Sequence, residues 1–157
     1  MTKFEELVEV HRRRLWAVAR TYTRGADAED LYQEIQTQLW RGYAAFKGEC
    51  AESTWVYRVA LNTAMGWQRK AMTQSRKAVV EPIATDAPGA SMGGRDELAI
   101  LREFLASLDQ TDRALLLLYL EDTSYREMGE VMGMTESNVG VRITRLKSAF
   151  TERYVGA

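Results

Sequence analysis

The sequence is poor in the residues from which most active sites and metal centres are built. Its 157 residues contain one cysteine, Cys50, and one histidine, His11. A single cysteine excludes an internal disulfide and any zinc site with several cysteine ligands, and it fits a reducing compartment. The sequence also lacks a glycine-rich phosphate loop and paired carboxylates in a known catalytic motif. We therefore expect no enzymatic activity and no cofactor.

Long apolar runs and a strong net charge are absent as well. No stretch of about 18 uncharged apolar residues occurs, and the N-terminal segment has no signal-peptide apolar run. We therefore expect a cytoplasmic protein with no membrane insertion. The net charge is only −1, so any contact with nucleic acid must come from local patches. The length and a hydrophobic content of 46% suit one domain or two small ones.

Helical periodicity begins near the N-terminus, with a predicted helix over residues 3–23. Its apolar stripe consists of Phe4, Leu7, Val8, Leu15, Val18 and Tyr22. His11 falls on the same stripe, and the sequence offers it no evident metal or catalytic partner. We interpret it as a partly buried structural histidine.

Asp27 is expected to cap a second helix, which reaches Gly42 and has two distinct faces. One face is apolar and contains Leu31, Tyr32, Ile35 and Leu39. The other is polar and contains Asp30, Gln33, Glu34, Thr37 and Arg41. The residues alone leave open whether the polar face is only solvated or binds a partner.

A third helix is predicted from Thr54, after an irregular stretch from Tyr43 to Ser53. Its inward side is expected to hold Trp55, Val56, Val59, Ala60 and Thr63. Its outward side is expected to hold Tyr57, Arg58, Leu61, Asn62, Arg69 and Lys70. Aromatic rings beside a basic helix suit single-stranded nucleic acid, because unstacked bases lie on the rings while cations follow the phosphates. The alternative is that the tryptophans are core or helix-interface residues, which we favour for Trp55.

Residues 73–95 have no strong period and contain both prolines, which predicts a flexible linker. The linker divides the chain into domains at 1–72 and 96–157. In the second domain, helices are expected to begin near Asp96 and after Asp109 or Thr111. The apolar stripe of the first contains Leu98, Leu101, Leu105 and Leu108, and the second is apolar almost all round. The predicted fold is all-α: two small helical domains, the C-terminal one with four helices.

The last two helices form a helix-turn-helix pattern between Thr123 and Phe150. Ser124 caps the shorter helix and Glu127 completes a capping box. Gly133 supplies the left-handed residue of the turn, and Thr135 caps the longer helix. Val139, Ile143, Leu146 and Phe150 recur at helical spacing along that longer helix.

The polar side of the longer helix has the chemistry of a major-groove reader. A ridge is formed by Asn138, Arg142 and Arg145, and the neighbouring outward face by Ser137, Val141, Thr144 and Ser148. Arginine reaches guanine or phosphate, asparagine pairs with adenine, and the methyl groups of valine and threonine meet that of thymine. The competing interpretation is an ordinary helix pair with a solvated basic face. The exposed Val141 favours DNA binding, since a solvated face has little use for it.

Two sets of segments, which together span almost the whole chain, resemble a known family. The segments DAEDLYQEIQTQLW, F-x-G-E and S-T-W-V-Y-R-V-A-x-N are similar to region 2 of bacterial sigma factors of the extracytoplasmic-function type. The segments L-x-x-F-L-A-S-L-D and LLLLYLEDTSYREMGEVMGMTESNVGVRITRLK are similar to their region 4. The resemblance implies an alternative sigma factor of the minimal two-domain group, which binds core RNA polymerase and directs promoter recognition and DNA opening.

The resemblance also implies roles for individual residues. The face that would dock on the coiled coil of the largest polymerase subunit consists of Asp30, Gln33, Glu34, Thr37 and Trp40. The stretch from Tyr43 to Ser53 would hold a base flipped out of the −10 element. The residues that would contact the melting duplex are Arg58, Asn62, Arg69 and Lys70. Those that would enter the −35 major groove are Ser137, Asn138, Arg142 and Arg145. The linker would thread through the polymerase, and an anti-sigma factor would clamp the two domains.

The sequence departs from the family pattern at two positions of the third helix. Leu61 stands where a basic residue is frequent, and Gly66 where an acidic one is common, which implies an altered promoter preference. Two alternatives stay open. A stand-alone helix-turn-helix regulator explains residues 96–157 but gives residues 27–70 no purpose. A sigma-like decoy would bind an anti-sigma factor without starting transcription.

Overall fold

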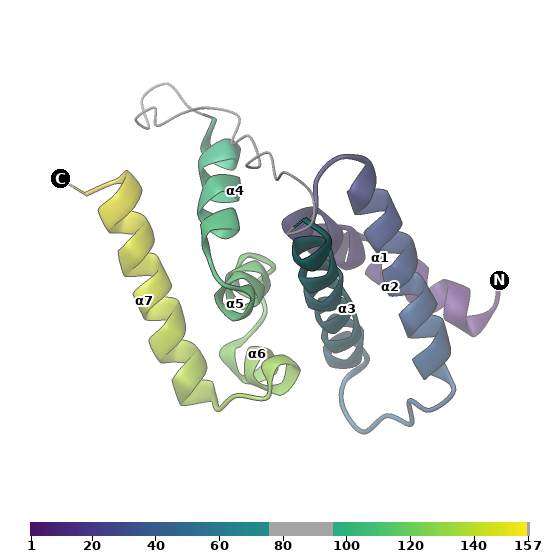
Figure 1. The fold of residues 1–157 in the computed structure, drawn as a ribbon. Helices are drawn as coiled ribbons and strands as arrows, with labels where there is room; N and C mark the ends of the chain where they lie inside the picture. Colours follow the sequence, from purple (N-terminus) through teal and green to yellow (C-terminus); the bar gives the residue numbers. More distant parts are fainter. Residues whose placement is uncertain (76–95, 157) are drawn as a thin grey trace.

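The computed structural model describes residues 1–75 and 96–156, and these residues form seven α-helices and no strands (Figure 1). The all-α prediction is therefore confirmed. The N-terminal group consists of α1 (Lys3–Tyr22), α2 (Ala26–Tyr43) and α3 (Glu52–Ser75). The C-terminal group consists of α4 (Glu97–Ser107), α5 (Gln110–Leu120), α6 (Tyr125–Met132) and α7 (Glu136–Tyr154).

The three helices of the N-terminal group bury the apolar stripes that the sequence predicts. Leu15, Leu31 and Leu39 have no exposed surface, and the Trp16 ring stacks on Tyr32 at a centroid distance of 4.1 Å. His11 is buried, as expected: its Nδ1 accepts a hydrogen bond from Arg14 at 3.0 Å, and its Nε2 lies 3.2 Å from a Glu52 carboxylate oxygen. A histidine held at both ring nitrogens fixes α1 against the start of α3.

The predicted cap of α2 is wrong. The helix begins at Ala26, directly after Gly25, which has a φ of +60° and makes no side-chain cap. Glycine takes this left-handed conformation at little cost and turns the chain into the helix before Asp27 is reached. Asp27 lies instead in the first turn, where the helix dipole favours a negative charge.

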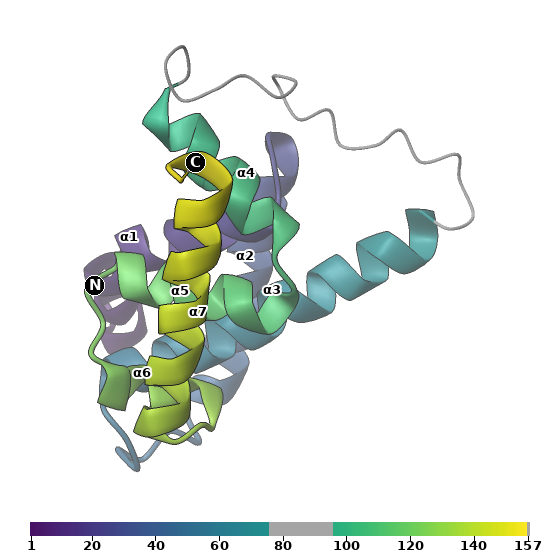
Figure 2. The same cartoon turned by 90° about the vertical axis from the view of Figure 1, so that its left-hand side faces the viewer.

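The C-terminal group is built around α5, whose residues Arg113 to Leu118 are all buried. The side chains of Ser124 and Thr135 each accept a hydrogen bond at the start of a helix, as the sequence predicts. Of the two candidates for α5, Asp109 is the cap, and Asp96 caps α4 in the same way. The apolar stripe of α4 was predicted in part: Leu105 is buried, and Leu101 and Leu108 pack against the core, but Leu98 is half exposed and the buried Ile100 and Phe104 were missed. Both views show α7 running along the whole group, from α6 at one end to α4 at the other (Figure 2).

The two groups share one hydrophobic core and pack on each other, mainly through α3 and α6. The hydroxyl of Tyr22 donates to the carbonyl of Gln110 at 2.9 Å, and the Arg113 guanidinium lies over the Tyr22 ring. In return, the side-chain amide of Gln110 donates to the carbonyl of Met65 at 3.1 Å.

This packing corrects two predictions for α3. Tyr57 and Leu61 were expected on the outside, but they are 2% and 1% exposed. They lie one turn apart on a face that was judged free because each group was considered alone. Two carboxylates of the other group, from Glu121 and Glu127, are close enough to Tyr57 to act on its pKa.

The end of α3 differs from expectation as well, because the helix continues to Ser75, three residues into the predicted linker. The rest of that linker, residues 76–95, lies outside the described residues. Among the residues that are described, no helix combines the length and the apolar character needed to cross a membrane.

Candidate nucleic-acid interface and docking surface

The turn between α6 and α7 has the geometry of a helix-turn-helix motif. Gly133 ends α6 in the left-handed region with a φ of +69°, and the Thr135 hydroxyl accepts from the Asn138 N–H at 3.1 Å. Gly129 lies under the turn, where a Cβ atom would come within 2.5 Å of the Met134 carbonyl oxygen. The motif therefore depends on glycine at 133 for its conformation and at 129 for its close approach.

The face of α7 that points away from the core is the one predicted to read DNA. Its exposed residues are Ser137, Asn138, Val141, Thr144, Arg145 and Ser148. Val141 keeps 48% of its surface exposed, so a methyl-bearing side chain does stand between polar neighbours. The Arg145 guanidinium has no ion-pair partner among the residues the structure describes.

Arg142, predicted to lie on the same reading ridge, has a different environment. Its Nη1 lies 3.1 Å from a carboxylate oxygen of Asp112, in the first turn of α5, and its side chain is 35% exposed. Sequence reasoning did not find Asp112 as a partner, because the two residues are 30 positions apart and no local pattern connects them.

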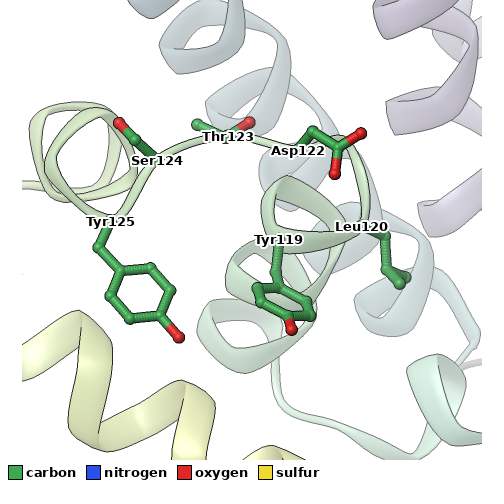
Figure 3. Close-up of a pocket in the computed structure, with 6 residues that line it drawn as sticks. All are labelled: Tyr119, Leu120, Asp122, Thr123, Ser124 and Tyr125. Atoms are coloured by element: carbon green, nitrogen blue, oxygen red, sulfur yellow. The ribbon is translucent and has the colours of Figure 1, made fainter.

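Two tyrosines support α7 from behind. The Lys147 ammonium lies 4.6 Å from the centre of the Tyr119 ring, and hydrogen bonding to the Tyr119 hydroxyl raises the pKa of Lys147. Tyr125 lies under Gly140, where an added Cβ would meet the ring at 3.6 Å. Figure 3 shows both tyrosines beside the α5–α6 turn. They line a shallow hollow there, with a volume of about 450 Å³. These contacts fix α7 from behind, whereas its outward face is left exposed.

The second predicted DNA surface lies on α3, where the structure separates the four candidates. Asn62, Arg69 and Lys70 are exposed. Arg58 is half-buried: its Nη2 donates to the Glu130 carbonyl oxygen of α6 at 2.6 Å. Arg58 is therefore engaged with the C-terminal group in this arrangement.

A groove of about 640 Å³ lies beside Arg58, between the loop before α3 and helix α6. Ser53 donates a hydrogen bond across it to Glu127 at 2.7 Å. This contact alters the predicted capping box of α6. The Ser124 hydroxyl does accept from the Glu127 N–H, but the Glu127 carboxylate accepts from Ser53 of the other group.

The predicted docking face of α2 is brought together on one side of the helix. Asp30, Gln33, Thr37 and Trp40 are exposed, and Glu34 is half-buried with its carboxylate accepting from Gln38 at 2.8 Å. Trp40 is 63% exposed although it is among the largest apolar side chains, and its ring meets Phe4 edge-on at 5.1 Å. An exposed tryptophan is typical of a protein-binding surface.

Comparison with known proteins accounts for both halves of the chain. The family model "Sigma-70 region 2" matches residues 7–73, and the model "Sigma-70, region 4" matches residues 98–150, so that together they span most of the chain. The chain is 27% identical over 126 residues to the RNA polymerase sigma factor YlaC of Bacillus subtilis, covering 76% of this chain and 73% of that protein. It is 29% identical over 160 residues to the ECF RNA polymerase sigma-E factor of Haemophilus influenzae, covering 92% and 83%.

The fold is similar to that of a solved sigma factor. The sigma factor RpoE, in its complex with the anti-sigma factor NepR from Bartonella quintana, superposes with a TM-score of 0.77, covering 97% of this chain and 96% of that one. The sequences are 19% identical, so this match bears on the fold alone.

Proposed function

The chain belongs to the sigma-70 family of RNA polymerase sigma factors, in its extracytoplasmic-function (ECF) group, and from this membership we propose how its surfaces act in transcription initiation. It is an alternative sigma factor: a dissociable subunit that directs core RNA polymerase to promoters. The observation that carries the proposal is the presence of two unpartnered surfaces in one chain, one on α2 with an exposed tryptophan and one on α7 with polar and methyl groups. The domain limits we propose are 1–72 and 96–157.

Core polymerase docks on α2. The proposed contact residues are Asp30, Gln33, Glu34, Thr37 and Trp40. Carboxylates towards the start of the face and an apolar ring at its end suit a partner surface with basic residues beside an apolar patch. Trp40 supplies apolar area at one end of the contact, and the carboxylates set its register.

The −10 element is opened along α3. The residues that contact its phosphates are Arg58, Asn62, Arg69 and Lys70, and the loop before α3 holds a flipped base. Unstacking a base costs a few kcal/mol, which these contacts must offset. The −35 element lies about 25 base pairs upstream, or about 85 Å at 3.4 Å per base pair. In this structure Arg58 of α3 donates to the Glu130 carbonyl oxygen of α6. We propose that this contact breaks, and that α3 and the C-terminal group separate, before both elements are bound.

The −35 element is read by α7, whose N-terminal half enters the major groove. The stand-alone regulator is a weaker explanation, since it gives the α2 face no function. The decoy loses one of its two supports, because Leu61 is buried and its apolar side chain does not lie on the DNA surface. We place the protein in the cytoplasm, without catalytic chemistry of its own. We also propose that an anti-sigma factor controls it by keeping the N-terminal and C-terminal groups packed on each other.

A charge reversal on α2 tests the docking surface. The double variant Asp30→Arg, Glu34→Arg should lose binding to core polymerase, because two attractive charges become repulsive across the contact. The matched control is Glu6→Arg, Glu9→Arg on α1, which changes the net charge equally at two exposed positions. Binding is measured by co-migration with purified core polymerase, and the fold by circular dichroism. If the α2 variant binds core polymerase as well as the α1 control does, the docking surface lies elsewhere.

A further inference from the structure

We infer that Arg142 is a positioning residue of the recognition helix, held by Asp112, and that base reading belongs to Asn138, Val141 and Arg145. The inference rests on the proposed function and refines it. The sequence placed Arg142 and Arg145 on one polar ridge, and the structure gives them different environments.

The direction of each side chain comes from its place on the helix. At about 100° per residue, Arg142 lies about 60° from the buried row of Val139, Ile143 and Leu146. Arg145 lies about 120° from that row and Val141 about 160°. Arg142 is therefore at the edge of the core, whereas Arg145 and Val141 point away from it.

The backbone of Asp112, the partner of Arg142, is held by a helix cap. The Asp112 N–H donates to the Asp109 carboxylate at 2.8 Å, in the first turn of α5, where the helix dipole stabilises negative charge. The Asp112 side chain is 27% exposed and that of Arg142 is 35% exposed, so neither group is fully solvated. The carboxylate occupies one guanidinium donor and compensates its charge, which weakens both base pairing and phosphate attraction.

The pair joins the start of α5 to the middle of α7. Tyr119 at the end of α5 and Tyr125 of α6 contact α7 at Lys147 and Gly140. These three contacts together fix the orientation of α7 on the C-terminal group. Loss of the Asp112–Arg142 pair should therefore loosen the approach of the whole helix to the groove rather than remove one base contact.

The test uses holoenzyme reconstituted from the full chain and core polymerase, on a promoter selected from a randomised pool by the wild-type holoenzyme. Affinity is measured for duplexes that differ by one base pair at each −35 position, and at several salt concentrations. Arg142→Ala should weaken binding about two- to fivefold on every duplex, the range of a partly exposed ion pair. Discrimination between base pairs and the dependence on salt should not change.

The contrast with Arg145 makes the result specific. Arg145→Ala should lose about five- to 150-fold of discrimination at one base pair, the range for an arginine that reads a base. Asp112→Asn should reproduce the uniform loss, and the double variant Asp112→Asn, Arg142→Ala should be no weaker than either single one. Circular dichroism and thermal unfolding confirm the fold of each variant.

Arg142→Lys keeps the inference testable if the alanine variant does not fold. Lysine retains the charge but not the paired donors of arginine, so discrimination should stay at the wild-type level if Arg142 only positions the helix. A loss of discrimination at one base pair in Arg142→Lys or Arg142→Ala would overturn the inference. So would a salt slope reduced by about one in Arg142→Ala, the mark of a phosphate contact. If Arg145→Ala leaves discrimination intact, base reading by Arg145 fails. The proposed −35 reading by α7 itself fails only if Asn138→Ala and Val141→Ala leave discrimination intact as well.

Discussion

The helix-turn-helix motif should fail when one methyl group is added under its turn. Gly129 lies in α6, and in Gly129→Ala the new Cβ would lie 2.5 Å from the Met134 carbonyl oxygen and 3.7 Å from the Glu136 nitrogen. Both atoms belong to the backbone, so no side chain can move aside. The turn itself must shift, and the start of α7 must shift with it.

The magnitude follows from two opposing effects. Alanine is favoured over glycine inside a helix by about 1 kcal/mol. Overpacking costs about 1–3 kcal/mol, and a clash with fixed backbone belongs at the upper end of that range. The net loss of stability is about 2 kcal/mol, which lowers the Tm of a chain of this size by about 4–8 °C.

Gly66→Ala is the matched control, because it is the same change in another helix. Its new Cβ meets only the end of the flexible Arg69 side chain, at 3.8 Å. The helix gain of up to about 1 kcal/mol is unopposed, and the Tm should rise by about 2–4 °C. Thermal unfolding followed by circular dichroism measures both, and −35 binding by the holoenzyme should fall only for Gly129→Ala. A Tm that rises in both variants would refute the reasoning.

Two further predictions concern the face of α3 that the C-terminal group covers. Leu61→Ala should cost about 2–5 kcal/mol in urea unfolding, as expected for a leucine with 1% exposure, and Asn62→Ala on the exposed side should cost far less. A loss below about 0.5 kcal/mol for Leu61→Ala would contradict the burial of this side chain. Burial, reinforced by the nearby Glu121 carboxylate, raises the pKa of Tyr57 from 10.0 to about 12, so the unfolded chain loses this proton first. The free energy of unfolding should therefore fall as the pH rises from 10 towards 12. Urea titrations of Tyr57→Phe should show a smaller fall, and the same pH dependence in the variant and the wild type would contradict the role of Tyr57.

The parts of the fold that could be predicted are those with local causes. Ser124 and Thr135 were recognised as caps because each lies just before a helical period, and Gly133 because a turn needs a left-handed residue. His11 was recognised as structural because it falls on an apolar stripe. Such features depend on residues within one or two helical turns of one another.

The errors have a different cause, since each depends on a partner far away in the chain. Tyr57 was placed outside because nothing in α3 shows that Glu121 and Glu127 of the second group lie near it. The Glu127 carboxylate was assigned to its own helix cap, but Ser53 is 74 positions away and takes it. Arg142 was placed with Arg145 by spacing, and its separation from Arg145 depends on Asp112 of another helix. Periodicity predicts the side of a helix on which a residue lies, but not which residues of other helices contact that side.

The central claim, that the chain gives core RNA polymerase the ability to recognise and open a promoter, is tested most directly by promoter opening. Purified protein and sigma-free core polymerase are combined with a supercoiled promoter library, and unpaired thymines are detected with permanganate. We predict opened DNA around the −10 element only when both components are present. A stable complex that opens no promoter from the library, or no complex at all, would contradict the account.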